Sequence, residues 1–367
     1  MSMKKIPAIF LIAAASLLCA ACAKTMEQAT NAGSKRAFDA WMHVHYQDKV
    51  GPVGFGTYII DDVEGSGAEI ADSNYIMVHY EIRQVSDSTF YSYTGEDIAR
   101  QMGEYDKHAP YVPYIMRVCR GDASQGVLDI IGGGKDEVSG KTYKRMRIGG
   151  TRTAIIPGWL TSTQKYYDNS QDYIDNVTGT DYIYRMTVVK QTKDIVQYQI
   201  DSIERYMNRH NMEIWDTTAH QGRGFYYWRD KAREKMRKVE VLDTVKFKED
   251  TSFYINYVGR LLNGTVFDTN IADSAKVWDL YSSSRTYSPV QINCKADSTA
   301  FTMGSGDDGD PTSVITGFSL TLWNMHPFES GRGLFTSNFG YGASGTGTRI
   351  TEYSPLIFEI DVVKDPN

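Results

Sequence analysis

The sequence predicts an α+β fold of two related domains, each an antiparallel, twisted sheet wrapped on a short helix.

 Segments in which apolar and polar residues alternate recur along the chain with turn residues between them, and few helical patterns interrupt them. The order helix, strand, gap, strand occurs twice, which indicates a diverged internal repeat. The length of 367 residues allows two domains of about 150 residues each.

The elements follow one another in the same order in both halves of the chain. Residues 35–45 carry apolar side chains at helical spacing, residues 56–67 form a strand that runs into a glycine-rich turn, and residues 74–83 alternate as a strand. In the second half, residues 315–325 predict the helix that crosses the sheet. The helix, the first strand and the alternating strand of the second repeat are expected in residues 200–211, 224–228 and 252–259.

These elements divide the chain into five parts. The connector between the two domains is expected to be helical, because apolar residues in its first half recur at helical spacing. The parts are a lipoprotein signal peptide (1–22), an N-terminal tether and helix (23–52), a first domain (53–194), a helical connector (195–223) and a second domain (224–367).

The N-terminus has the pattern of an export signal that ends at a lipidated cysteine. Lys4 and Lys5 precede an apolar run over residues 6–21, which is too short to span a membrane comfortably. The small residues before Cys22 resemble a bacterial lipobox, in which the cysteine is acylated; ordinary secretory cleavage is the alternative. We therefore expect a body in the cell envelope, lipid-anchored to the outer membrane and facing either the periplasm or the cell surface.

Composition excludes some classes of partner. The formal net charge of −6 and the pI of about 5.7 give no basic surface for nucleic acid, and the basic run in residues 231–238 is expected to be a solvated face. Cys119 and Cys294 lie far apart and are expected to be reduced, in separate cores. His43 and His45 fall on a helix without a third ligand nearby, so no metal site is predicted.

Residues 254–269 are the most informative segment. Apolar and polar residues alternate on both sides of Asn263 and Gly264, which predicts two half-buried strands joined by a tight hairpin. The segment ends on Phe267 and Asp268, so a carboxylate follows directly on an aromatic core residue, where an unpaired charge is costly. We therefore expect Asp268 to have a function.

Together with residues 314–318 (Val-Ile-Thr-Gly-Phe) and 339–343 (Phe-Gly-Tyr-Gly-Ala), this segment resembles the FKBP-type peptidyl-prolyl cis-trans isomerase family. The resemblance implies an isomerase that needs neither metal nor cofactor. It implies catalytic roles for Tyr257, Asp268 and Tyr341, with Asp268 as a polar anchor beside the substrate carbonyl and the Tyr341 hydroxyl as donor to the carbonyl before proline. The residues that it implies for the substrate pocket are Phe267, Phe301, Val314, Ile315, Phe318, Ile350 and Phe358.

Three features depart from the family pattern. Phe318 stands where the family usually has tryptophan, which keeps an aromatic floor of smaller area. Residues 349–352 (Arg-Ile-Thr-Glu) replace the usual Ile-Ile-Pro-Pro of the last loop, which puts substrate preference in question. Residues 270–298 form an unusually long insertion beside the pocket. A lid, a peptide-binding extension and a contact for another protein all remain open for it.

The first domain keeps the frame of the second and loses much of the pocket. No Tyr-Gly-Ala sequence occurs in it, and we expect an FKBP-like but inactive domain that is kept for binding or spacing. Its loop over residues 164–181, rich in tyrosine and asparagine, is a candidate contact surface. The expected counterparts of Tyr257, Phe267, Asp268 and the Val-Ile pair are Tyr80, Phe90, Tyr91 and Val127–Leu128.

The leading interpretation is a peptidyl-prolyl isomerase with a folding or chaperone role. Its expected partners are proline-containing unfolded or exported proteins, and its second domain would act on their X-Pro bonds. The alternative, from another class, is a non-catalytic FKBP-like subunit that binds peptides or proteins within an envelope complex.

Overall fold

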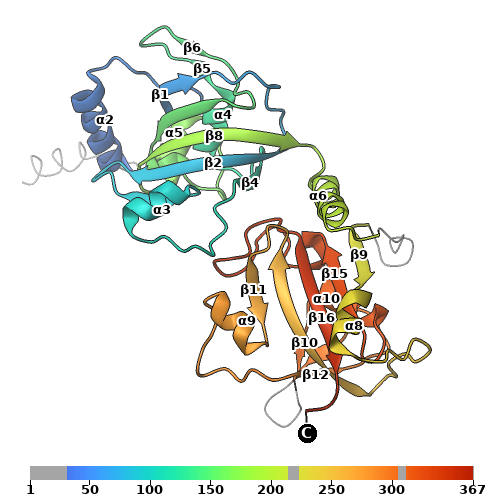
Figure 1. Ribbon diagram of the computed structural model, residues 1–367. Coiled ribbons are helices and arrows are strands. Elements are labelled where there is room, and N and C mark those ends of the chain that lie inside the picture. The colour runs from blue at the N-terminus through green and yellow to red at the C-terminus, as the bar shows by residue number, and fades with distance from the viewer. Residues whose placement is uncertain (1–30, 214–222, 305–310, 367) are drawn as a thin grey trace, which may run out of the picture.

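The computed structural model describes residues 31–213, 223–304 and 311–366. Figure 1 presents two separate sheets, with the helix α6 (Ile195–Arg209) at one side between them. Within these three ranges, none of the helices combines the length and the hydropathy that a membrane-spanning segment requires. The predicted signal segment and Cys22 lie outside the described residues.

The first domain contains a six-stranded sheet in the order β1-β7-β8-β2-β3, with β4 paired to β2. The helix α4 (Gln125–Gly132) packs against this sheet, and α2 (Ala32–Tyr46) buries Phe38 and Met42 in the same core. The strands are β1 (Tyr58–Val63), β2 (Tyr75–Gln84), β3 (Phe90–Tyr93), β4 (Tyr114–Arg117), β7 (Thr151–Ile156) and β8 (Tyr182–Thr192). The smaller elements are α3 (Glu96–Met102), β5 (Gly134–Lys135), β6 (Thr142–Tyr143), η1 (Gly158–Leu160) and α5 (Ser170–Asn176).

The second domain contains an eight-stranded sheet in the order β14-β13-β12-β10-β16-β15-β9, with β11 paired to β10. The helix α10 (Thr316–Asn324) crosses it and buries Phe318, Leu320 and Leu322. The strands are β9 (Phe225–Arg229), β10 (Ser252–Leu261), β11 (Val266–Thr269), β12 (Val290–Asn293), β13 (Thr302–Met303), β14 (Thr312–Ser313), β15 (Ser330–Phe335) and β16 (Leu356–Val363). The remaining helices are α8 (Lys231–Arg237), α9 (Ala272–Val277) and η2 (Ser337–Phe339).

Both sheets have one topology. The order β1-β7-β8-β2-β3 of the first domain recurs as β9-β15-β16-β10-β11 in the second, and β4 and β12 pair with the equivalent strands β2 and β10. Registers agree as well, since Tyr80 lies opposite Met186 on β8 and Tyr257 lies opposite Ile360 on β16. All of these pairings are antiparallel. The predicted α+β fold and the internal repeat are therefore confirmed.

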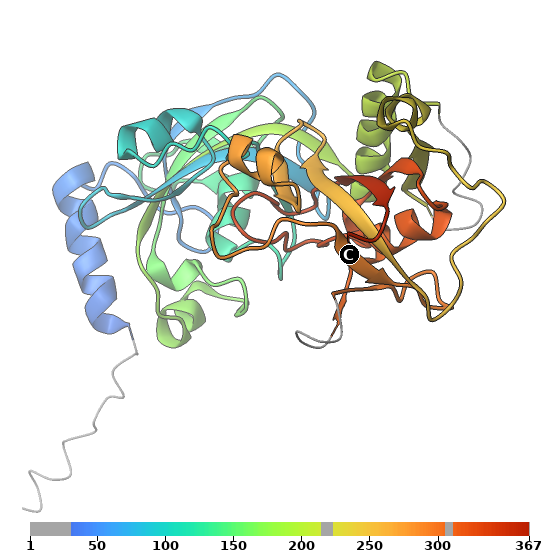
Figure 2. The same ribbon diagram turned by 60° about the horizontal axis from the view of Figure 1, so that its bottom comes forward.

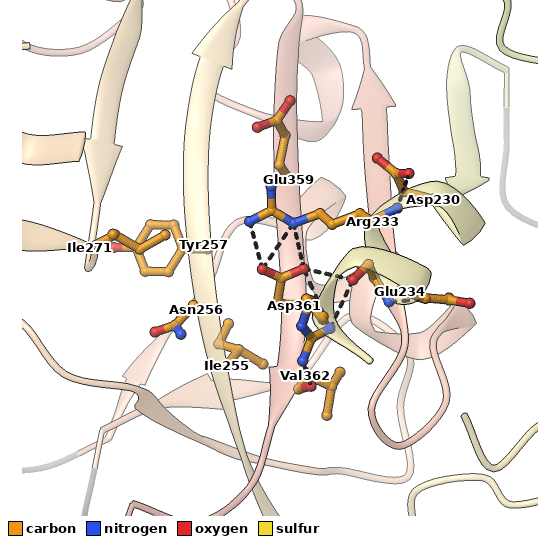
Figure 3. Close-up of polar contacts among 12 residues, drawn as sticks. Asp230, Arg233, Glu234, Ile255, Asn256, Tyr257, Ile271, Glu359, Asp361 and Val362 are labelled. Carbon is orange, nitrogen blue, oxygen red and sulfur yellow. Dashed lines mark hydrogen bonds and ion pairs between the residues drawn. The ribbon is translucent and has the colours of Figure 1, made fainter. Parts of the chain in front are cut away.

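The helix α8 is held against the outer face of the second sheet by a partly buried ionic cluster (Figure 3). Arg233 donates to both carboxylate oxygens of Asp361 on β16, at 2.7 Å from Nε to Oδ1 and 2.7 Å from Nη2 to Oδ2. Arg237 donates to the hydroxyl of Ser330 at 2.8 Å, and Ser330 donates to Asp361 at 2.7 Å. The prediction of a solvated face for residues 231–238 is wrong for these two arginines.

The ionic cluster changes the titration of Asp361. Burial by itself raises the pKa of this carboxyl group, but the hydrogen bonds from Arg233 and Ser330 outweigh burial and hold the pKa below its usual value. Because the side chain of Asp361 is only 8% exposed, loss of its charge would leave two arginines without their main partner.

The tyrosines of the loop over residues 164–181 pack inward, whereas most of its polar residues are exposed. The loop contains the short helix α5, whose Tyr173 is fully buried in the core of the first domain. Tyr166 also turns inward, since its hydroxyl donates to the carbonyl oxygen of Ala123 at 2.8 Å. Its aromatic residues therefore serve the packing of the domain.

The two cysteines of the described residues are both free thiols. Cys294 is buried in the core of the second domain, as expected, but Cys119 is half-exposed in the turn that follows β4. The prediction of a core position is confirmed for Cys294 and is wrong for Cys119.

Candidate functional site

Four aromatic rings of the second domain form the apolar part of the candidate site. Phe358 on β16 lies at their centre, with edge-to-face contacts to Phe318 at 4.8 Å and to Phe267 at 5.5 Å between ring centroids. Tyr257 on β10 stands edge-on to Phe318 at 5.7 Å. These residues come from β10, β11, β16 and α10, because alternate positions of the strands face the helix that crosses the sheet.

Gly259 leaves the space in which two of these rings meet. It lies on β10 opposite Phe358. A Cβ atom at this position would stand 2.5 Å from Cε2 of Phe267 and 3.1 Å from Cε1 of Phe358. Any side chain here would therefore displace both aromatic walls.

A hydrogen-bonded triad lies at the edge of the aromatic group. The hydroxyl of Tyr257 donates to Oδ2 of Asp268 at 2.6 Å, and Nη1 of Arg285 donates to Oδ1 at 2.8 Å. The backbone N–H of Thr269 donates to the same Oδ1 at 2.8 Å, and Nη2 of Arg285 donates to the Tyr257 hydroxyl at 3.2 Å. The carboxylate is thus paired and fixed, with its side chain 39% exposed at the mouth of the site.

Arg285 is a site residue that the sequence alone does not reveal. It lies 17 positions after Asp268, inside the long insertion, so no local spacing links the two residues. The sequence indicates only that a positively charged residue lies in the insertion that begins beside the pocket.

Both tyrosine hydroxyls of the site are protonated at neutral pH. Burial, followed by the negative charge of Asp268, raises the pKa of Tyr257 far above its usual value. The same two causes raise the pKa of Tyr341, which is 37% exposed at the rim. Tyr341 therefore keeps a proton that it can donate to a bound carbonyl group.

Val314 and Ile315, which stand at the N-terminus of α10, differ in their backbone roles. Val314 donates its backbone N–H to the carbonyl oxygen of Phe301 at 3.3 Å, so this N–H is already used, whereas Ile315 is the residue that caps the helix. Phe301 is buried, and its ring contacts Phe253 at 6.5 Å and Trp323 at 6.3 Å. Phe301 thus lies in the same core cluster as the rings of the site, but its ring contacts are to Phe253 and Trp323.

The last loop of the domain is held by Arg349. Its Nη1 donates to the carbonyl oxygens of Val266 at 3.0 Å and Trp278 at 2.7 Å, which ties this loop to β11 and to the insertion. The neighbouring Ile350 is buried in the same core cluster as the aromatic rings. Arg349 also lies 3.8 Å from Asp106 of the first domain.

The long insertion contacts the first domain. After the helix α9, Asp279 lies 3.3 Å from Nζ of Lys107 and 3.2 Å from Nε2 of His108. The ring of His108 packs against Trp278 at 4.8 Å. The segment that carries Arg285 to the site is therefore held at its start by the first domain, and the end of the insertion forms β12.

The first domain retains the position of the site with different residues. The register shift in the pairing of β2 with β3 places Ser92 opposite Ile82, as Asp268 lies opposite Gly259. Ser92, not Tyr91, is the counterpart of Asp268, and the distance between the hydroxyls of Tyr80 and Ser92 is 3.1 Å. The predicted alignment of Phe90 and Tyr91 is thus wrong by one residue.

The helix of the first domain corrects a second alignment. Ser124 caps α4, as Ile315 caps α10, so Val127 occupies the place of Phe318. Val127 and Leu128 are therefore not the counterparts of the Val-Ile pair, which fall on Ala123 and Ser124. Ser124 thus stands in the place of Ile315, and Val127 stands in the place of the aromatic ring of Phe318.

Comparison with known proteins gives a match for the second domain. Residues 243–363 match the family of FKBP-type peptidyl-prolyl cis-trans isomerases. No curated protein matches the chain.

Solved structures give remote similarity. The three FKBP domains of wheat FKBP73 share 14% identity over 84% of this chain and 95% of that chain, with a TM-score of 0.26. FkpA from Escherichia coli shares 16% identity over 47% of this chain and 61% of that chain, with a TM-score of 0.29. A peptidyl-prolyl cis-trans isomerase from Pseudomonas syringae shares 18% identity over 46% of this chain and 91% of that chain, with a TM-score of 0.27. The assignment of the family rests on residues 243–363.

Proposed function

Because residues 243–363 belong to the FKBP-type peptidyl-prolyl cis-trans isomerase family, we propose that the second domain isomerises X-Pro bonds of polypeptides. One observation carries this proposal. The paired carboxylate of Asp268 and the aromatic rings of Phe318 and Phe358 converge on Tyr257, and the charge of Asp268 contributes to the raised pKa of Tyr341.

The reaction requires binding energy and no chemical group transfer. Rotation about an X-Pro bond has a barrier of about 20 kcal/mol, because the twisted state loses amide resonance. A site accelerates the rotation when it binds the twisted state more tightly than either planar isomer. An apolar pocket for the prolyl ring and fixed polar groups for the twisted amide meet this requirement.

Each site residue has a role in this mechanism. Phe318 and Phe358 hold the prolyl ring, and the hydroxyl of Tyr341 donates to the carbonyl before proline. Asp268 faces the twisted amide as a fixed negative charge, since Arg285 and Tyr257 prevent it from turning away. Phe267, Ile315 and Ile350 complete the walls.

The direct test is a proline-limited assay on the mature chain. A chromogenic tetrapeptide with one X-Pro bond is expected to isomerise faster in the presence of the protein, in proportion to enzyme concentration. No acceleration at micromolar protein would contradict the proposal and favour a non-catalytic binding subunit.

We further propose that the protein acts on exported proteins as a lipid-anchored envelope protein. Cys22 and the apolar run before it support this location. Incorporation of a palmitate analogue is expected in the wild type and lost in Cys22→Ser, with the variant released from the membrane fraction. Equal labelling of both proteins would contradict the anchor.

A cavity between the domains favours a second role, the holding of unfolded clients. It has a volume of about 330 Å³ and is lined mainly by apolar side chains. Pro110 and Val112 come from the first domain, and Leu261, Leu262 and Pro355 come from the second. We propose that it takes apolar segments of the polypeptide whose X-Pro bond is isomerised.

Two substrates separate holding from catalysis. Val112→Asp combined with Leu262→Asp is expected to slow the catalysed refolding of a proline-limited protein several-fold, with tetrapeptide isomerisation unchanged. Equal effects on both substrates would show that the cavity has no separate role in client binding.

A further inference from the structure

The first domain has a cavity of its own, at the place that the isomerase site occupies in the second domain. Its volume is about 220 Å³. Three tyrosines from three strands line it, namely Tyr80 on β2, Tyr114 on β4 and Tyr184 on β8. Tyr80 and Tyr114 stand edge-to-face with ring centroids 5.7 Å apart.

The cavity differs chemically from the site of the second domain. Val127 stands in the place of Phe318, and Ser92 stands in the place of Asp268. The aromatic floor for a prolyl ring is therefore lost, and tyrosine rings remain on the side walls. The faces of such rings carry negative electrostatic potential, which attracts cations within about 6 Å.

Two carboxylates add negative charge at this cavity. Asp122 lines it directly. Glu352, in the loop of the second domain that follows Ile350, lines the neighbouring cavity between the domains, and its charge acts on Tyr80 and Tyr114. The edge-to-face contact of Tyr353 with Tyr75 on β2, at 5.4 Å, fixes that loop against the first domain. Neither carboxylate belongs to an ion pair within the residues that the structure describes.

Negative charge near the cavity contributes to the raised pKa values of two of its tyrosines. Burial raises the pKa of Tyr80 and of Tyr114, and the charge of Glu352 raises both further. Asp122 adds to the effect on Tyr114. The negative charge of Glu352 thus acts on both tyrosines, and that of Asp122 acts on Tyr114.

Basic side chains near the cavity are engaged elsewhere. Arg120 lies 3.6 Å from Asp168 and donates to the carbonyl oxygen of Tyr167, and Arg117 donates to the carbonyl oxygen of Ser73. No lysine or arginine is among the described residues that line the cavity. A positively charged ligand in the cavity would therefore supply the charge that neutralises Asp122 and Glu352.

We propose that this cavity binds the cationic side chain of a lysine or arginine in a client polypeptide. The three tyrosines surround the stem and head of the side chain, and the two carboxylates pair with its charge. The half-buried carboxylate of Glu352, the exposed carboxylate of Asp122 and the faces of the tyrosine rings together compensate for the desolvation of the cation. Glu352 lies two residues after Ile350, so this site would hold a client beside the isomerase pocket.

Binding of small model compounds tests the proposal directly. The probes are Nα-acetyl-lysine methylamide, its uncharged analogue Nα-acetyl-norleucine methylamide, and tetramethylammonium, each titrated into the full chain and followed by NMR. The lysine compound is expected to bind with a Kd in the millimolar range, as suits one side chain in one pocket, at about 1 mM. Norleucine is expected to bind at least fivefold more weakly.

Variants locate the site. Glu352→Gln and Tyr114→Leu are each expected to weaken lysine binding at least fivefold, whereas Glu69→Gln, an exposed carboxylate elsewhere on the same domain, is expected to leave it unchanged. Glu352→Gln keeps the shape of the side chain, so its effect reports charge. Higher salt is expected to weaken binding further.

Three results would overturn the proposal. Equal affinity for the lysine and norleucine compounds would mean that the cavity is merely apolar. Tetramethylammonium bound as tightly as the lysine compound would assign the cavity to small free amines. Unchanged lysine binding in both Glu352→Gln and Tyr114→Leu would place binding elsewhere on the chain.

Discussion

The two domains share one sheet topology and differ at the residues of the pocket. Tyr80 and Tyr257 occupy equivalent positions, and each hydroxyl contacts the equivalent residue of the next strand. That residue is Ser92 in the first domain and Asp268 in the second. Since the fold forms with either residue, the fold does not require the carboxylate, and its presence in the second domain points to function.

The space between the strands differs in the same way. Ile82 of the first domain occupies the position of Gly259, where any side chain would collide with Phe267 and Phe358. The contact of Phe267 with Phe358 is thus available only where a glycine leaves room for it. The comparison shows how one scaffold can hold a group of four aromatic rings in one copy and lack it in the other.

The crossing helices differ in a buried position as well. Asp129 of α4 is buried and accepts hydrogen bonds from the N–H of Phe55 at 2.8 Å and from the hydroxyl of Thr57 at 3.2 Å. The capping residues of the two helices align it with Leu320 of α10. The first domain therefore uses polar bonds where the second uses apolar packing.

Removal of Asp361 should have the largest effect, and only on the second domain. Asp361→Ala leaves Arg233 and Arg237 without their carboxylate, and we expect a loss of about 3 kcal/mol in the free energy of unfolding. Hydrogen exchange would show it as lost protection in β15 and β16. An equal loss of protection in β7 and β8 of the first domain would contradict the expectation that the two cores are independent.

Asp129 should make the stability of the first domain depend on pH. Burial raises the pKa of this carboxyl group to about 6, above its value of about 4 in an unfolded chain. The folded state thus binds more protons between these values, and stability should fall by about 2 kcal/mol as the pH rises through this range. Asp129→Asn should remove that slope, measured by urea unfolding at several pH values.

The second domain provides the contrast for this measurement. The lowered pKa of Asp361 gives a contribution to stability that is complete above the ordinary carboxyl pKa and is lost as the pH falls below it. A fall in pH should therefore lower the stability of the second domain through Asp361 and raise the stability of the first domain through Asp129. An Asp129→Asn variant with an unchanged slope would contradict the assignment to this group.

Filling the space at Gly259 should impair the pocket with a smaller effect on stability. Gly259→Ala pushes against Phe267 and Phe358, and we expect kcat/KM for a prolyl tetrapeptide to fall about tenfold. Ala154→Gly, at a buried position of the first domain, serves as a control that leaves the rate unchanged. Full activity of Gly259→Ala would show that the aromatic walls can move freely.

The contact between the domains should have the smallest effect. His108→Ala removes the ring that packs on Trp278 and the partner of Asp279. Because these contacts are partly exposed, we expect a rise of about twofold in KM with kcat nearly unchanged. His43→Ala, exposed on α2, is the matched control. Equal effects of the two substitutions on KM would contradict a role for the contact between the domains.

The sequence was sufficient to predict the fold and the grouping of Tyr257, Phe267, Asp268, Phe318 and Phe358, because the motifs that carry them are local patterns. Alternating strands and the Asn263–Gly264 turn need only neighbouring residues. The alignment of Tyr91 with Asp268 failed because the register shift after Ile82 comes from pairing between strands. Arg285 was missed because its link to Asp268 spans a long insertion, and such contacts follow from tertiary structure.

The central claim is that one domain of the pair carries the isomerase site, and matched double variants test it most directly. Asp268→Ala with Tyr257→Phe removes the polar pair of the second domain, and Ser92→Ala with Tyr80→Phe removes the equivalent pair of the first. We predict that the first double variant lowers kcat/KM for a prolyl tetrapeptide at least tenfold, and that the second leaves it at the wild-type value. Equal losses in both variants, or a loss only in the second, would contradict the account.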